Sequence, residues 1–327
     1  MGDRPLVSVI IPVYNRSELL FKAVNSVLKQ TYQNFEIIVV DDNSSENIGE
    51  ALSRIADKRV NCIKNSRARG PAGARNAGMM AAKGEYIAFL DSDDEFLPGH
   101  LEDSVFVLEN EPGTGIVFGK ARYYTEDGRE TDYMWPNLIK KVGRIANASD
   151  KGKYLVFNDF IFKFMLREGC FFNLPSVVMK REIADKEFLM REDIFHIHDL
   201  EYWQRVSRYY KFAYLKNDQI KYSIHGENIS IPYTKEHAAD ILSEELKSYH
   251  IMSNYNFLEP DDKIIINKNI ARVHFEQGYK KRKARNYKEA QKSYIKSLYF
   301  NFSLLTVKAY LAAILLRAWS ALFRRGS

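Results

Sequence analysis

The sequence predicts an α/β fold, in which a mostly parallel sheet is flanked by helices and a helical C-terminal region follows. Two observations predict it. Short β-branched apolar runs alternate with amphipathic segments over the first third of the chain, and the last third has helical periodicity. The expected strands are 7–11, 35–40, 60–63, 86–90 and 116–118, and the expected helices between them are 17–30, 48–55, 72–82 and 98–109.

Each of these elements has its own signal. The first strand is a continuous apolar run that ends at Pro12, as a buried parallel strand does. The first helix has apolar residues at i, i+3 and i+4, for example Leu20, Ala23 and Val24. The Ala-rich helix is expected to stop before Gly84. In an alternation of this kind the strands lie parallel, with helices on both faces of the sheet.

The composition is that of a globular protein. Of 327 residues, 46% are hydrophobic and 28% charged, which excludes disordered and collagen-like chains. Two cysteines, Cys62 and Cys170, are too few for a disulfide framework and fit a reducing compartment. We see no secretory leader and no apolar run of about 20 residues. A cytoplasmic location is therefore expected.

Polar residues cluster where the predicted strands end. They are Tyr14 and Asn15, Asp41 and Asp42, Asn65, and the run 91–94. In parallel sheets, ligands bind beyond these carboxyl ends. Any one of these residues could instead cap the following helix. Helix capping explains the run Asp91-Ser92-Asp93-Asp94 less well, because its three carboxylates repel one another unless a cation or basic groups compensate them. Such oxygen-rich clusters suit Mg²⁺ or Mn²⁺ with a substrate phosphate.

Three other phosphate-binding classes are disfavoured. The first strand is followed by Pro12-Val13-Tyr14-Asn15 rather than by a G-x-G-x-x-G dinucleotide fingerprint, and a Walker A loop is absent from the sequence. Haloacid-type phosphatases also use a D-x-D pair, but directly after their first strand. Here the pair follows the fourth predicted strand, which leaves a metal-carboxylate anchor for a diphosphate.

Four motifs in order carry a family resemblance. They are 9–15 (VIIPVYN), 36–44 (EIIVVDDNS), 73–78 (GARNAG) and 89–94 (FLDSDD). Together they resemble the catalytic domain of family 2 glycosyltransferases, which have the GT-A fold. The resemblance implies inverting transfer of a sugar from a nucleotide donor, most simply a UDP-sugar with Mn²⁺ or Mg²⁺, to a glycan or lipid-linked acceptor in bacterial surface-polysaccharide synthesis. A protein that kept this fold and binds nucleotide or glycan without turnover is the alternative.

The resemblance also assigns roles to residues. Asp93 would ligate the metal, and Asp91 would contact the ribose or the metal shell. Arg75 would stabilise the nucleotide, and His225 would be a third metal or phosphate ligand. The expected contacts to the donor are completed by Pro12, Val13, Tyr14, Asn15, Asp41, Asn65 and Ser92.

The catalytic base is expected in the stretch 198–205 (HDLEYWQR), which resembles the family's Glu-Asp motif followed by Trp and Arg. His198 stands where Glu is usual, and Asp199 is the predicted base. Inverting transfer needs a carboxylate that takes the acceptor's proton. Asp199 could instead sit in the first turn of a helix, and Glu201 is an alternative base. His196 and His198 have no evident third ligand, so a zinc site is not predicted.

The chain is expected to divide into a catalytic domain, 1–230, and a helical region, 231–327. Within the first, 1–120 would bind the nucleotide and 121–230 would hold the acceptor and the base. Residues 278–327 contain twelve Lys or Arg and one acid, a net charge of +11, whereas the remainder has 36 basic and 41 acidic residues, a net charge of −5. This asymmetry predicts an anionic partner for the end alone.

The expected helix 304–323 is amphipathic. One side contains Thr306, Ala313, Arg317, Ser320 and Arg324, and the other side is apolar except for Lys308. Such a helix could lie on an anionic membrane surface, here the inner face of the cell membrane. It could equally pack on the protein body or on a second copy, so a homo-oligomer stays open. Nucleic acid is not an expected partner, because the aromatic residues there have core spacing.

Overall fold

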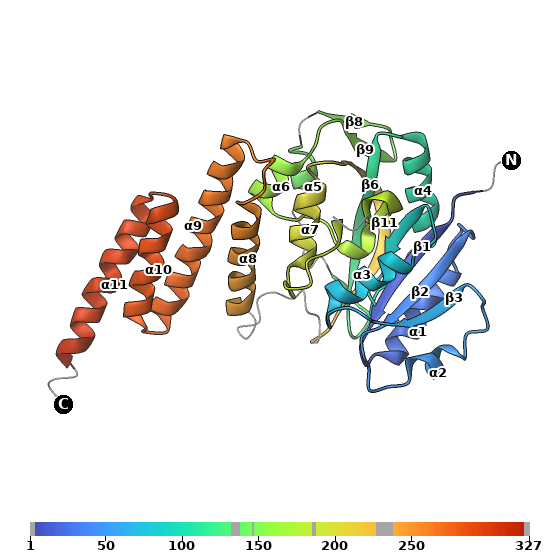
Figure 1. Ribbon diagram of the computed structural model, residues 1–327, viewed down its shortest axis with the longest axis horizontal. Coiled ribbons are helices and arrows are strands. Elements are labelled where there is room, and N and C mark those ends of the chain that lie inside the picture. The colour runs from blue at the N-terminus through green and yellow to red at the C-terminus, as the bar shows by residue number, and fades with distance from the viewer. Residues whose placement is uncertain (1–3, 132–137, 146, 185–187, 227–237, 324–327) are drawn as a thin grey trace. The chain divides into compact units, whose positions relative to one another are not determined.

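The computed structural model describes residues 4–131, 138–145, 147–184, 188–226 and 238–323 (Figure 1). The chain forms two compact units, Met1–Asn228 and Ile229–Ser327. The first unit contains the sheet, and the second is helical in its described part.

Four parallel strands begin the sheet of the first unit. They are β1 (Val7–Val13), β2 (Phe35–Asp41), β3 (Val60–Lys64) and β4 (Tyr86–Phe89), and they lie side by side in the order β3-β2-β1-β4. β1 and β2 are buried along almost their whole length, as β-branched runs in a covered parallel sheet should be. The predicted strands are confirmed, and their carboxyl ends meet at one edge.

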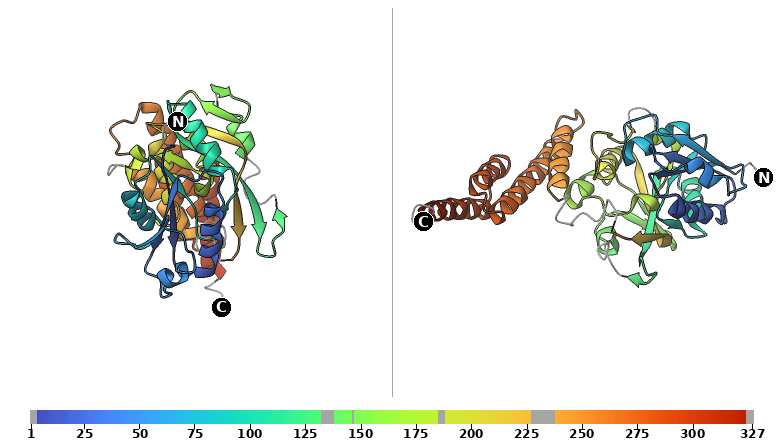
Figure 2. Two further views of the ribbon diagram at one scale, coloured as in Figure 1. Left: turned by 90° about the vertical axis from the view of Figure 1, so that its right-hand side faces the viewer. Right: turned by 90° about the horizontal axis from the view of Figure 1, so that it is seen from below.

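Helices cover both faces of these strands (Figures 1 and 2). α1 (Ser17–Leu28) and α4 (His100–Asn110) pack on one face, and α3 (Pro71–Ala81) packs on the other. The short α2 (Ile48–Leu52) joins β2 to β3. A Cβ on Gly78 of α3 would lie 2.4 Å from Ile10 Cγ2, so this glycine allows α3 to approach β1 closely.

The remainder of the sheet is mixed. β10 (Val178–Lys180) lies antiparallel between β4 and β6 (Thr114–Thr125), and β11 (Lys211–Ile224) runs parallel to β6. The predicted strand 116–118 is therefore only part of a longer one. The outer strands are β9 (Tyr154–Phe157) and β8 (Ala148–Asp150), and two small strands, β5 (Glu95–Phe96) and β7 (Glu130–Thr131), pair with β11 and β6. The helical elements here are α5 (Leu138–Val142), α6 (Phe162–Glu168), α7 (His198–Val206) and the 3₁₀ turns Leu174–Ser176 and Arg181–Ala184.

The aromatic segment 171–179 lies in the core. Phe171 and Phe172 are fully buried, and Phe172 stacks on Phe118 with ring centroids 4.4 Å apart. Trp203 of α7 packs edge-on against Phe89 of β4 in the same cluster. This packing fixes α7 beside the end of β4, because a large buried ring has little freedom to shift.

The described part of the second unit consists of α8 (Ala238–Met252), α9 (Pro260–Lys283), α10 (Tyr287–Phe300) and α11 (Leu304–Phe323). α9 begins with a capping box between Glu259 and Asp262. α9 and α10 pack tightly where Gly278 faces the ring of Tyr294, since a Cβ there would come within 2.7 Å of the ring. Among the described helices, none has the length and apolar character to span a bilayer.

Candidate active site

The acidic run follows β4 at the edge where the parallel strands end. Asp91, Asp93 and Asp94 each offer a carboxylate oxygen, and these atoms lie within 4.8 Å of one another. The run is closed by a turn in which the Asp94 N–H donates to the Asp91 carbonyl at 3.0 Å. The turn thus points three carboxylates at one volume, with Ser92 buried among them.

Asp93 is held by two basic side chains from other elements. Its Oδ2 accepts from Arg16 Nη1 at 2.6 Å and lies 2.9 Å from His225 Nε2. Burial acts to raise the pKa of Asp93, but the hydrogen bond with His225 and the charge of Arg16 outweigh it and hold the pKa below its ordinary value. Asp93 is therefore an ionised carboxylate next to a histidine, and the structure brings together Asp93 and His225, two of the three predicted metal ligands.

Asp91 lies in a second network, built on α3 and α7. Arg75, itself buried, bonds Asp91 Oδ1 through Nη2 and contacts His198 Nε2 through Nη1 at 2.7 Å. Arginine can only donate, so His198 Nε2 accepts, and the Nδ1–H of His198 donates to the Phe195 carbonyl oxygen 2.8 Å away. His198, where the family usually has Glu, is thus a neutral acceptor that orients Arg75.

Asp94 differs from its neighbours because it has no cation beside it among the described residues. Its Oδ1 accepts from the Ser223 N–H at 2.9 Å, whereas its buried Oδ2 has no hydrogen-bond partner in the described part of the chain. Burial, together with the charges of Asp93 and Asp91, raises its pKa well above the ordinary value. An unsatisfied buried carboxylate oxygen beside two further carboxylates is a donor set that fits a hard divalent cation.

Asp199 lies in the first turn of α7, next to His198. Its Oδ1 accepts from the Leu200 N–H at 2.8 Å, and the positive charge of Arg75 acts on its carboxylate. Burial raises its pKa, although the Arg75 charge and the backbone N–H groups oppose the shift. A raised pKa makes a carboxylate a stronger base.

Glu201, the alternative base, has a different environment. It is fully buried and accepts from Arg205 at 2.9 Å and 3.0 Å through both carboxylate oxygens. Arg205 also donates to the Leu189 carbonyl, so this pair fixes the segment before α7. Of the two acids, Asp199 is the one close to Arg75 and Asp91.

The ends of β1, β2 and β3 form a neighbouring corner. Tyr14 is largely exposed and lies under the Arg69 guanidinium, 4.7 Å from the ring centroid. Asn15 has a left-handed backbone (φ 50°), and its Oδ1 accepts from the Ser45 N–H at 2.7 Å. This bond joins the ends of β1 and β2, next to the predicted donor residues Pro12 and Val13.

The same corner contains Asp41, Asp42 and Asn65, which make different hydrogen bonds. Asp41 caps the loop after β2 by accepting from the Ser44 N–H at 2.8 Å. Asp42 accepts from Asn65 Nδ2 at 2.6 Å and from the Gly70 N–H at 2.8 Å, which anchors the entry to α3. Asn65 is thus held by Asp42, and its role toward a nucleotide stays a prediction.

Sequence reasoning left out several residues that the site uses. Arg16 was given no role, Asp42 and Asp94 were named only as members of the polar clusters at the strand ends, and His198 was considered only as a departure from the family and as a rejected zinc ligand. Arg16 and Asp94 directly follow predicted site residues, which is a signal that could have included them. Nothing in the sequence pairs Arg16 with Asp93, because they are 77 positions apart. Asn228 and Ser230, which extend the His225 motif, lie outside the described residues.

The fold and the acidic edge after β4 define the GT-A class of nucleotide-sugar-dependent transferases. The crystal structure of residues 1–349 of TarS from S. aureus has the same fold, with a TM-score of 0.65 at 15% identity over 98% of this chain and 92% of that one. A mannosyltransferase from Pyrobaculum calidifontis, PcManGT, in complex with GDP-Man and Mn²⁺, gives 0.58 at 19% identity over 98% and 84%. At these identities the likeness shows the fold alone.

Residues 8–185 match the family model described as glycosyl transferase family 2, and this chain belongs to that family. Among curated relatives, the Escherichia coli protein WfaP, a UDP-Glc:alpha-D-GlcNAc-diphosphoundecaprenol beta-1,3-glucosyltransferase, is 42% identical over 121 residues. That match spans 37% of this chain and 47% of WfaP, so the chain aligns with about half of that relative's length.

Proposed function

We propose that this protein transfers a sugar, with inversion, from a nucleoside-diphosphate sugar to a hydroxyl of a lipid-linked glycan at the cytoplasmic face of the cell membrane. One observation carries the proposal: Arg75 joins the acidic edge after β4 to the start of α7, where Asp199 lies. The predicted donor site is thereby linked to the helix turn that holds the predicted base, and the charge of Arg75 acts on Asp199. The name of WfaP supports UDP as the nucleotide and a lipid-linked acceptor.

Asp199 would act as the general base. The acceptor oxygen forms a bond to the anomeric carbon while the bond from that carbon to the diphosphate oxygen breaks, and its electron pair leaves with the nucleotide. The proton of the acceptor hydroxyl goes to an Asp199 carboxylate oxygen. The raised pKa of Asp199 suits this task, because proton transfer is most efficient when the base's pKa approaches the working pH.

Asp91, Asp93, Asp94 and His225 are the residues that would hold a divalent cation, Mn²⁺ or Mg²⁺. When bound, such an ion neutralises charge on the departing diphosphate. Arg75 is the fixed guanidinium beside this position and would hold Asp91 in place through its bond. His198 keeps that guanidinium oriented from the other side.

The corner formed by β1, β2 and β3 would bind the nucleoside. Tyr14 offers an exposed ring beside the cationic Arg69, a surface on which a base can stack. Asp41 and Asn65 lie at the neighbouring strand ends, and Pro12 and Val13 end β1 directly before Tyr14 and Asn15. Ser92, between Asp91 and Asp93, would be a further contact to the nucleotide sugar.

The test is turnover in the full chain. With Mn²⁺, a polyprenyl-diphosphate-linked sugar acceptor and a panel of nucleotide sugars, we expect nucleotide release from one donor. Asp199→Asn should lower that rate by about 10²–10⁴-fold because it removes the base. The donor should still raise the melting temperature of the variant. Asp127→Asn, which changes an exposed carboxylate in the β6–β7 turn, is the matched control and should keep full activity.

Two results would contradict the proposal. If Asp199→Asn turned over at the wild-type rate, the base would be elsewhere. If the wild-type protein bound a nucleotide sugar but released no nucleotide with any donor, the chain would be a binding module that has kept the fold.

A further inference from the structure

α11 packs against its neighbours with the side that contains Thr306, Tyr310 and Ala313 rather than with its leucines. The face that meets α10 contains Thr306 and Ala313, both buried, and Gln291 of α10 donates to the Ala313 carbonyl at 3.3 Å. Arg317, on the same side of the helix, donates to Gln291 Oε1 at 3.1 Å. A helix that packed on its own unit in the usual way would bury its large apolar residues instead.

The opposite face of α11 is apolar and exposed. Leu315 is 70% exposed and Trp319 is 61% exposed. We name this surface the α11 apolar face; its residues are Leu304, Leu311, Ile314, Leu315 and Trp319. Single exposed apolar residues are common in proteins, but a continuous stripe along one helix marks an interaction surface.

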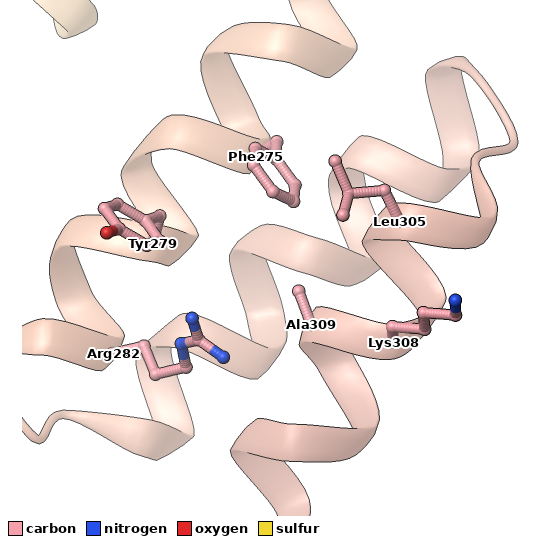
Figure 3. A pocket seen from close by; sticks show the side chains of 6 residues that line it. All are labelled: Phe275, Tyr279, Arg282, Leu305, Lys308 and Ala309. Carbon is pink, nitrogen blue, oxygen red and sulfur yellow. The ribbon is translucent and has the colours of Figure 1, made fainter.

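A pocket of about 390 Å³ connects this helix to the basic end of α9 (Figure 3). Phe275 and Tyr279 of α9 face Leu305 and Ala309 of α11 across it, with Arg282 beside them. Lys308 also lines the pocket and lies along the apolar stripe. Apolar walls and two cations are thus presented together.

The charge of the segment distinguishes between occupants of the surface. Residues 278–327 carry twelve basic side chains and the single acid Glu289, and this acid is paired with Lys292 at 2.7 Å. A second copy would bring the same net charge of +11 to the contact, which is repulsive. An anionic bilayer supplies an apolar interior and negative head groups at the same surface, and it complements both features.

We propose that the α11 apolar face and the basic end of α9 dock in the plane of a bilayer that contains anionic phospholipid, with Arg282 and Lys308 at the lipid phosphates. This docking proposal rests on the proposed function in one respect, which is that the sugar acceptor lies at a membrane. Docking would bring the catalytic unit to a lipid-linked acceptor and is separable from the transfer reaction.

The experiment is co-sedimentation of the full chain with phosphatidylcholine vesicles, with and without phosphatidylglycerol. The wild-type protein should sediment with the anionic vesicles only, and added salt should release it. L311S/L315S/W319S should weaken binding by at least about tenfold, because the serines remove the inserted side chains. R282E/K308E should weaken it by about fivefold or more for each residue changed.

Matched controls lie on exposed positions of α9. Ile264→Ser replaces an apolar residue with serine, and Lys268→Glu reverses a basic charge. Both positions lie on α9 far from the pocket, so both variants should bind the anionic vesicles as the wild-type protein does. All variants should keep wild-type transfer to a water-soluble acceptor, so a failure of docking is distinguishable from a failure of the proposed function.

Three outcomes would overturn the proposal. The wild-type protein could stay in the supernatant with anionic vesicles, or L311S/L315S/W319S could bind them as the wild-type protein does. If light scattering instead showed a wild-type dimer that this triple variant lost, the α11 apolar face would be an interface between copies of the chain.

Discussion

The two units of the molecule expose and bury opposite kinds of side chain. The first unit, Met1–Asn228, buries charges that are compensated by ion pairs such as Asp93 with Arg16 and Asp91 with Arg75. The helical unit turns Leu315 and Trp319 to solvent. Burying a charge is costly unless it is paired, and exposing a row of apolar residues is costly unless something covers them. The contrast is the one expected if the first unit holds the proposed site and the second holds the proposed docking surface.

The largest expected effect concerns the most deeply buried ion pair. Glu201→Ala would remove the carboxylate that accepts two bonds from the buried Arg205 and should destabilise the first unit by about 3–5 kcal/mol. Scanning calorimetry should show its melting temperature falling by roughly 10 °C.

The helical unit offers the matched comparison. Glu245 there pairs with Arg272, whose side chain is 44% exposed, so Glu245→Ala should cost about 1 kcal/mol or less. Equal losses in the two variants would show that burial of charge does not distinguish the units.

A pH-dependent effect should come from His100 in α4. Burial lowers the pKa of His100 to about 4, whereas the pKa in the unfolded chain is near 6.5. Between these values the unfolded state binds the extra proton, so stability falls as the pH drops from 6.5 toward 4, by about 3 kcal/mol in all. Urea unfolding across this range should show the loss, and His100→Gln should flatten that part of the profile. An unchanged slope in the variant would assign the acid sensitivity to other groups.

Local patterns were enough to predict much of the fold and part of the site. The continuous apolar runs of β1 and β2 and the polar residues after them are local signals, so the edge that gathers Asp41, Asp91 and Asp93 was predictable. β10 has only three residues, and its antiparallel insertion between β4 and β6 depends on contacts distant in sequence. A short strand of this kind leaves no periodicity to detect.

Long-range pairings limited the prediction of the site in the same way. Arg75 meets His198 across 123 positions, and no local pattern records that contact. The periodicity of α11 predicted an amphipathic helix but not which side would pack, and the structure packs the side that contains Thr306. Periodicity defines the faces of a helix, while the neighbouring helix decides which face is covered.

The central claim is that the acidic edge after β4 holds the nucleotide diphosphate through a divalent cation. Calorimetric titration of UDP and of GDP into the wild-type protein and Asp93→Asn, with Mn²⁺ and with chelator, tests it directly. We expect one nucleotide to bind the wild-type protein at least about tenfold more tightly with Mn²⁺ than without, and Asp93→Asn to lose this difference. Wild-type affinity that is the same with Mn²⁺ and with chelator, or an Asp93→Asn variant that keeps the full Mn²⁺ effect, would contradict the claim.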